Sequence, residues 1–145
     1  MRVQIENLVP AEIYVQALSK TADSREQAMI NSCQRLEGKR KTPKVEMETI
    51  RMMQEVLLES QTPEVRAVAA AGLGNSGNVA SVPHLLDAME DDALVTRQSA
   101  ARSVGRLMGW REGFDPKDPP DARAESVERF RERWILFEAS DLFQV

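Results

Sequence analysis

The side chains that most often do chemistry in proteins are sparse in this 145-residue chain. His84 is its only histidine and Cys33 its only cysteine. A protein zinc site needs three or four ligands, and a nucleophile needs a base beside it. The sequence therefore predicts no metal site and no catalytic residues. We expect His84 at the surface, and Cys33 as a buried, inert thiol on the apolar face of its helix.

Two other motifs have structural explanations. Gly72, Gly74 and Gly77 have the spacing of a dinucleotide-binding loop, but they end a predicted helix instead of following a strand, so the phosphate-binding mechanism fails. The adjacent carboxylates of Asp91 and Asp92 fall in a predicted turn, where capping or solvation explains them. No cofactor is expected.

Arginine supplies a more informative pattern. Gln98, Arg102 and Arg106 recur at i, i+4 and i+8, so they share one helix face that points away from the expected core. One repeat earlier, the same positions hold small or amide side chains, Ala67, Ala71 and Asn75. Arginine forks bind carboxylates through two parallel hydrogen bonds. We predict that this surface binds an acidic segment of another protein; the alternative is an ordinary solvated face.

Two further segments could contact a partner. The turn-rich stretch 38–44 holds Lys39, Arg40, Lys41 and Lys44, and it is expected to be a solvated loop or a contact for an anion or a nucleic acid. The tail 141–145 is apolar and could dock on the body of the protein or on a partner.

The composition limits the classes of function. The formal net charge is −4, with 42% hydrophobic and 29% charged residues, as in a soluble globular protein. Sequence-independent nucleic-acid binding needs a dense basic face, so nucleic acid is an unlikely partner. No apolar run approaches the length of a membrane helix, and the N-terminus does not resemble a signal peptide. We expect a cytoplasmic protein.

The stretch 62–109 contains an internal repeat. Its first half aligns with its second half after a shift of 31 residues. The identical pairs are Arg66 with Arg97, Ala69 with Ala100, Ala70 with Ala101 and Gly74 with Gly105. Repeats of this length indicate stacked supersecondary units, and here each unit has the periodicity of two helices.

The repeat organises the whole chain into one predicted all-α domain, residues 1–145. We predict an α-solenoid of about three helical hairpins, closed by a capping helix. The units are a degenerate first unit at 10–38, a second at 43–75, a third at 78–108 and the capping helix at 121–138. The capping helix carries a bulky apolar stripe of Val127, Phe130, Trp134 and Phe137, which suits the closed end of a stack.

These units resemble HEAT repeats, in particular the short variety found in bilin-lyase-type proteins. The matching residues are Val65, Arg66, Ala69, Ala70, Gly72, Leu73 and Gly74, then Val82, Pro83, Leu85 and Leu86, then Thr96, Arg97, Ala100, Ala101, Val104 and Gly105. The resemblance implies that the second helices of successive units line a concave surface. It also implies an aspartate in the turn between helices; Asp91 and Asp92 fit this role and are expected to bond Arg97 or turn amides.

The resemblance implies a non-catalytic module that binds another protein. Two alternatives stay open. One is a bilin-lyase-type enzyme subunit, for which the sequence shows no distinctive catalytic residue. The other is a helical-repeat DNA-binding protein similar to the alkyl-base glycosylases, against which the net charge argues. The sequence does not indicate an oligomeric state.

Overall fold

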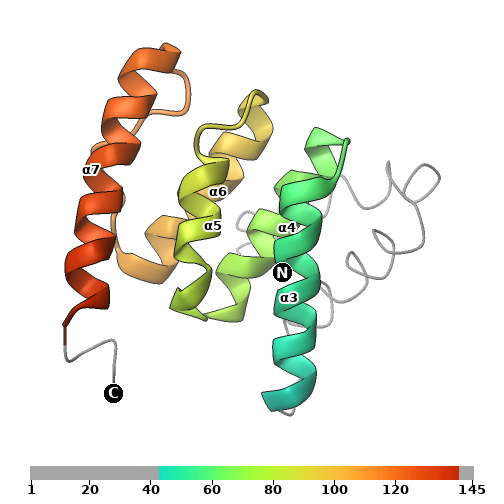
Figure 1. Cartoon of the computed structure of the whole chain (residues 1–145). Helices are drawn as coiled ribbons and strands as arrows, with labels where there is room; N and C mark the ends of the chain where they lie inside the picture. Colours follow the sequence, from blue (N-terminus) through green and yellow to red (C-terminus); the bar gives the residue numbers. More distant parts are fainter. Residues whose placement is uncertain (1–42, 141–145) are drawn as a thin grey trace, which may run out of the picture.

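The structure is a computed structural model that describes residues 43–140 (Figure 1). This part of the chain contains five α-helices and one short 3-10 helix, which confirms the all-α prediction. The elements are α3 (Pro43–Glu59), α4 (Pro63–Ser76), η1 (Val79–Ser81), α5 (Val82–Ala88), α6 (Leu94–Met108) and α7 (Pro120–Glu138). The predicted unit 10–38, most of the basic loop and the tail 141–145 lie outside the described residues.

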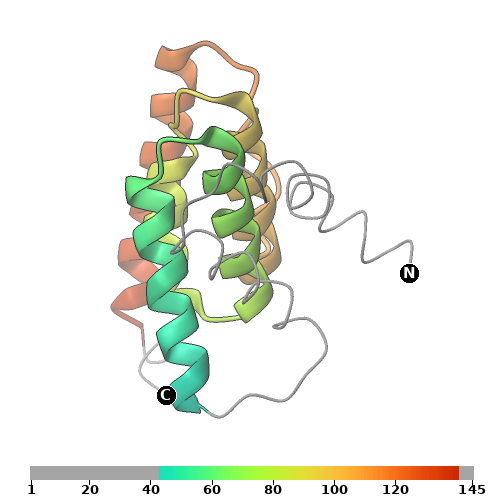
Figure 2. The same ribbon diagram turned by 90° about the vertical axis from the view of Figure 1, so that its right-hand side faces the viewer.

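The helices form two layers. α3, α5 and α7 lie side by side in one layer, and α4 and α6 form the other, as the two views show together (Figures 1 and 2). Each sequential pair, α3 with α4 and α5 with α6, is a hairpin packed against the next element. α4 and α6 share the most extensive contact between helices. This is the arrangement expected of a short HEAT array. None of the helices between residues 43 and 140 is long and apolar enough to cross a bilayer.

Proline and glycine set the ends of the helices. α3, α4 and α7 each begin at a proline, whose missing N–H is not needed in the first turn. α4 and α6 end at Gly77 and Gly109, whose positive φ angles of 75° and 78° favour glycine. Thr62 lies at the N-cap position before α4, but its side chain makes no capping hydrogen bond. Its own N–H donates instead to Oγ of Ser60.

One continuous apolar core runs through all five helices. On α3, Ile50, Met53, Val56 and Leu57 are buried, whereas Met47 and Leu58, which fit the same helical spacing of apolar residues, are 40% and 78% exposed. Leu58 follows Leu57 around the helix by about 100°, and Leu57 takes the buried position. On α7, Val127, Phe130 and Trp134 are buried and Phe137 is half-buried, as the predicted stripe requires.

The seam between α4 and α6 is unusually close. Adding a Cβ atom to Gly74 of α4 would place it 2.3 Å from Oγ of Ser103 on α6. Three hydroxyls of α6 donate to backbone carbonyls of α4. The pairs are Thr96 with Pro63 at 2.9 Å, Ser99 with Ala67 at 2.6 Å and Ser103 with Ala70 at 2.7 Å. Small residues and hydroxyls therefore fix the spacing of the two repeats together.

Candidate protein-binding surface

The arginine row of α6 faces outward. Arg102 and Arg106 are exposed and Gln98 is half-buried. Nη1 of Arg106 donates to the amide oxygen of Asn75 on α4, so the structure brings these two predicted positions together. Among the described residues, the guanidinium of Arg102 has no hydrogen-bond or ion-pair partner. We call Gln98, Arg102, Arg106 and Asn75 the arginine edge.

The two alanines predicted for the binding surface, Ala67 and Ala71, are less exposed than expected. Ala67 is fully buried and Ala71 is only 9% exposed, so Ala67 does not form the exposed floor that the repeat pattern predicted. The reason is the close seam: Ser99 packs over Ala67 and donates to its carbonyl. Ala71 borders a depression of about 10 Å³ beside Ser99 and Arg102, which is too small for a ligand of its own. Binding at all six predicted positions remains a prediction.

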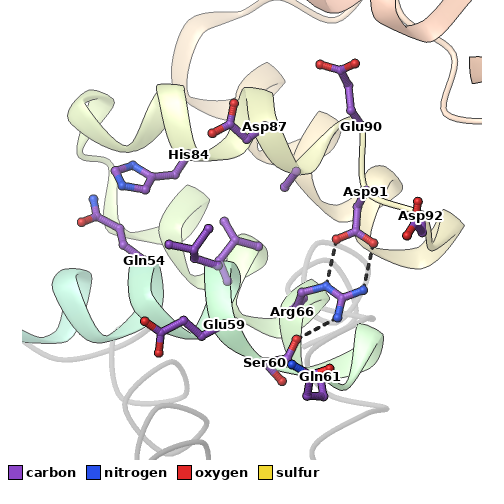
Figure 3. Close-up of a pocket in the computed structure, with 13 residues that line it drawn as sticks. Gln54, Glu59, Ser60, Gln61, Arg66, His84, Asp87, Glu90, Asp91 and Asp92 are labelled. Carbon is purple, nitrogen blue, oxygen red and sulfur yellow. Dashed lines mark hydrogen bonds and ion pairs between the residues drawn. The ribbon is translucent and has the colours of Figure 1, made fainter. Parts of the chain in front are cut away.

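Arg66 and Arg97 occupy the same position in successive repeats, and they have a structural role that the sequence pattern did not reveal. Nη1 of Arg66 donates to the carbonyl of Ser60, at 2.8 Å, in the turn before its own helix. Its Nε and Nη2 donate to the two carboxylate oxygens of Asp91 in the next unit, at 2.8 and 3.0 Å (Figure 3). Arg66 therefore ties two successive turns together. The signal that could have revealed this role was the identity of Arg66 and Arg97 at the same repeat position.

Arg97 repeats this arrangement one unit later. Its Nη1 donates to the carbonyls of Asp91 and Asp92, at 2.8 and 3.0 Å, and its Nε donates to the carbonyl of Pro116, at 2.9 Å. Burial, and next the charge of Arg123, lower the pKa of Arg97, while the two aspartates oppose this shift. The predicted bond between Arg97 and these aspartates thus goes to their backbone oxygens.

Asp91 also supports the turn in which it lies. Its Oδ1 accepts from the backbone N–H of Ala93, at 2.8 Å, which is the predicted bond to a turn amide. The carboxylate thus joins the start of α6 to Arg66 of the preceding repeat. Asp91 and Arg66 explain how the array holds its turns in register, and neither is left free for a ligand.

A larger groove lies between the end of α3 and α5, on the other layer (Figure 3). Its volume is about 440 Å³. His84 lines one end beside Gln54, and Asp91 and Asp92 line the other. His84 is half-buried, not fully at the surface, and its Nδ1 is buried without a hydrogen-bond partner from residues 43–140. Among the described residues, no group of three or more acidic, histidine or cysteine side chains is placed to hold a metal ion. Cys33 lies outside these residues.

Comparison with known proteins agrees with this architecture. The family model for HEAT repeats matches residues 14–105 and again residues 50–126. No curated protein and no solved structure matches the chain. The two matches together cover the paired helices, the seam between them and the turns that Arg66 and Arg97 join. The chain belongs to the HEAT-repeat family.

Proposed function

We propose that this chain is a non-catalytic module that binds an acidic segment of another protein at the arginine edge. The observation that carries the proposal is the pair of exposed guanidiniums of Arg102 and Arg106, one helical turn apart on α6. α6 is fixed to α4 by three side-chain hydrogen bonds, so the two cations sit on a rigid support. Stacked helical hairpins generally provide extended recognition surfaces of this kind.

The chemistry of the edge supports a carboxylate-bearing partner. Arg102 has no partner among the described residues, so all of its donors are available, and Asn75 holds Arg106 in place from the neighbouring helix. A carboxylate that bridges these guanidiniums would form charge-assisted hydrogen bonds.

The proposal also covers the subclass of the repeats. By resemblance, they are the short HEAT repeats of bilin-lyase-type proteins, and the proposed function does not include the enzymatic activity of those proteins. The single imidazole and single thiol of the chain support the non-catalytic assignment.

Reversing the charge of the edge should weaken binding of an acidic peptide. In the double variant Arg102→Glu/Arg106→Glu, we expect the Kd for a fluorescein-labelled hexaglutamate peptide to rise at least about tenfold, because two attractive contacts become repulsive. Fluorescence anisotropy at physiological ionic strength measures this change. The matched control is Arg51→Glu/Lys117→Glu, which makes the same charge change at exposed positions outside the edge.

The control should weaken binding less than about twofold, since charges beyond the Debye length are screened. Equal losses in the two variants would mean that only net charge matters. Unchanged affinity in the edge variant would mean that the edge is an ordinary solvated face. Either result would overturn the proposal.

A further inference from the structure

Arg111 follows α6 in the sequence, but its side chain folds back onto that helix. α6 ends at Gly109, whose positive φ of 78° turns the chain, and the N–H of Arg111 donates to the carbonyl of Gly109 at 3.0 Å. A Cβ atom added to Gly105 would lie 3.2 Å from Cγ, 3.4 Å from Nη1 and 3.8 Å from Cζ of Arg111. Because Gly105 has no side chain, the guanidinium of Arg111 rests directly on the surface of α6.

The position of Gly105 places this guanidinium beside the arginine edge. At about 100° per residue, Gly105 lies about 60° from Arg102 around α6, and Arg106 lies about 40° from Arg102 on the opposite side. Residues three apart on a helix have Cβ atoms about 5–6 Å apart, so Nη1 of Arg111 is within about 9 Å of Cβ of Arg102. One segment of a partner could therefore contact all three arginines.

The three guanidiniums have no carboxylate partner among the described residues. Arg102 and Arg111 make no side-chain hydrogen bond or ion pair with these residues, and Arg106 bonds to the neutral amide of Asn75. All three arginines are exposed, on a chain whose formal net charge is −4. Like charges on one face repel one another, so a bound anionic segment would relieve a local excess of positive charge.

The arginines of α7 differ from this group. Each of the four contacts another side chain or a carbonyl of the described part of the chain. The contacts are Arg123 with the carbonyl of Asp118, Arg129 with Ser126, Arg131 with Asp87 and Glu90, and Arg133 with the rings of Trp110 and Phe130. Arg102 and Arg111 lack such contacts, so their donors are available to a partner.

We propose that Arg111 is a third cation of the binding surface, positioned by Gly105, and that the surface recognises a segment with at least three acidic side chains in close succession. The inference rests on the proposed function, which concerns Arg102 and Arg106. The segment runs across α6, from Arg106 beside α4, over Arg102, to Arg111 on the side away from α4. Each arginine fork takes one carboxylate, so a segment with only two acidic side chains leaves one guanidinium without a partner.

The test counts carboxylates, using the full chain and fluorescein-labelled hexapeptides with two or three adjacent glutamates and glutamine elsewhere. In the wild-type chain, we expect the third glutamate to lower the Kd about fivefold at physiological ionic strength, as for one added charge-assisted contact. In the variant Arg111→Gln, the third glutamate should lower the Kd less than about twofold, because its guanidinium is gone.

The matched control is Lys117→Gln, which removes another exposed cation of the same loop. The residue before it, Pro116, accepts a hydrogen bond from Arg97, which precedes Gly105 by eight residues, or about 12 Å along α6. This separation exceeds the Debye length of about 8 Å, so the control should keep the fivefold gain from the third glutamate.

Gly105→Gln tests the positioning role of the glycine without changing the charge. The new side chain occupies the place of the Arg111 side chain, so we expect the gain from the third glutamate to be lost here as well. In the double variant Gly105→Gln/Arg111→Gln, the Kd should rise less than about twofold beyond that of Gly105→Gln, because both changes remove the same contact. Thermal unfolding of each variant shows whether it is folded.

Three results would overturn the inference about Arg111. They are the absence of a gain from the third glutamate in the wild-type chain, an undiminished gain in Arg111→Gln, and an equal loss of the gain in Lys117→Gln. A full gain in folded Gly105→Gln would overturn the role of Gly105. An undiminished gain in Arg111→Gln, together with weakened binding in Arg102→Glu/Arg106→Glu, would leave the proposed function standing, so the two failures are distinguishable.

Discussion

Replacing Arg66 by alanine should lower the free energy of unfolding by about 3 kcal/mol, the low end of the cost of breaking a buried ion pair. Arg66 makes three hydrogen bonds that join the turn before α4 to the turn before α6. The side chains of Arg66 and Asp91 are only 16% and 14% exposed, so truncation leaves a largely desolvated carboxylate without its partner. The carbonyl of Ser60, a buried residue, loses its bond as well.

Urea denaturation of the Arg66→Ala variant measures this cost. Arg66→Lys should recover only part of the loss, because an ammonium cannot form the bidentate fork and reach Ser60 at the same time. The matched control is Arg102→Ala, the same substitution at an exposed arginine without a described partner, which should cost less than about 0.5 kcal/mol. If Arg66→Ala cost no more than Arg102→Ala, the link between successive turns would contribute nothing to stability.

Placing a methyl group in the seam should cost about 2 kcal/mol in the variant Gly74→Ala, in the range seen for overpacked cores. The new Cβ would lie 2.3 Å from Oγ, 2.7 Å from Cβ and 3.0 Å from Cα of Ser103. Ser103 cannot turn aside freely, because its hydroxyl donates to Ala70 across the same seam. The helix-propensity gain of alanine over glycine, about 1 kcal/mol, opposes the clash and is smaller than it.

Gly105→Ala is the control for Gly74→Ala, because Gly105 occupies the equivalent position one repeat later. There the three nearest atoms to the added Cβ all belong to the side chain of Arg111, and the closest is its Cγ at 3.2 Å. Arg111 is exposed and can shift, so this variant should range from neutral to about 1 kcal/mol more stable. Chemical denaturation of both variants gives the comparison. A Gly74→Ala protein as stable as Gly105→Ala would show that α4 and α6 do not approach each other so closely.

The internal repeat explains why the fold could be predicted from the sequence. The matched alanines marked the buried stripe, and Ala69 and Ala100 are both fully buried. The same pattern misplaced Ala67, because periodicity assigns a residue to a helix face but does not say how far a neighbouring helix covers that face. Nor does periodicity distinguish Leu57, which is buried, from Leu58, which is exposed, since two adjacent leucines fit one apolar stripe equally well.

The candidate sites were less accessible to sequence reasoning. Spacing on a single helix was enough to place Arg102 and Arg106 together. The groove between α3 and α5 was missed because its lining residues are spread from Gln54 to Asp92 and come together only when α3 packs against α5. The bonds of Arg66 to Asp91 and Ser60 were missed for the same reason. Asp91 and Asp92 were expected to bond Arg97, but that they do so through their carbonyl oxygens leaves no mark on the amino-acid sequence.

The arginine edge depends on a rigid support, because it lies on α6, which is bound to α4 through the seam. If neighbouring repeats could separate locally, the edge would not hold its charges in a fixed arrangement. The central claim is therefore that α4 and α6 open together as one cooperative unit.

Native-state hydrogen exchange, followed by mass spectrometry on peptides from α4 and α6, tests this claim most directly. We predict that the slowest amides of both helices exchange with the same opening free energy, and that Arg66→Ala lowers both values by the same amount. Exchange of α6 through a separate, smaller opening that Arg66→Ala leaves unchanged would contradict the account.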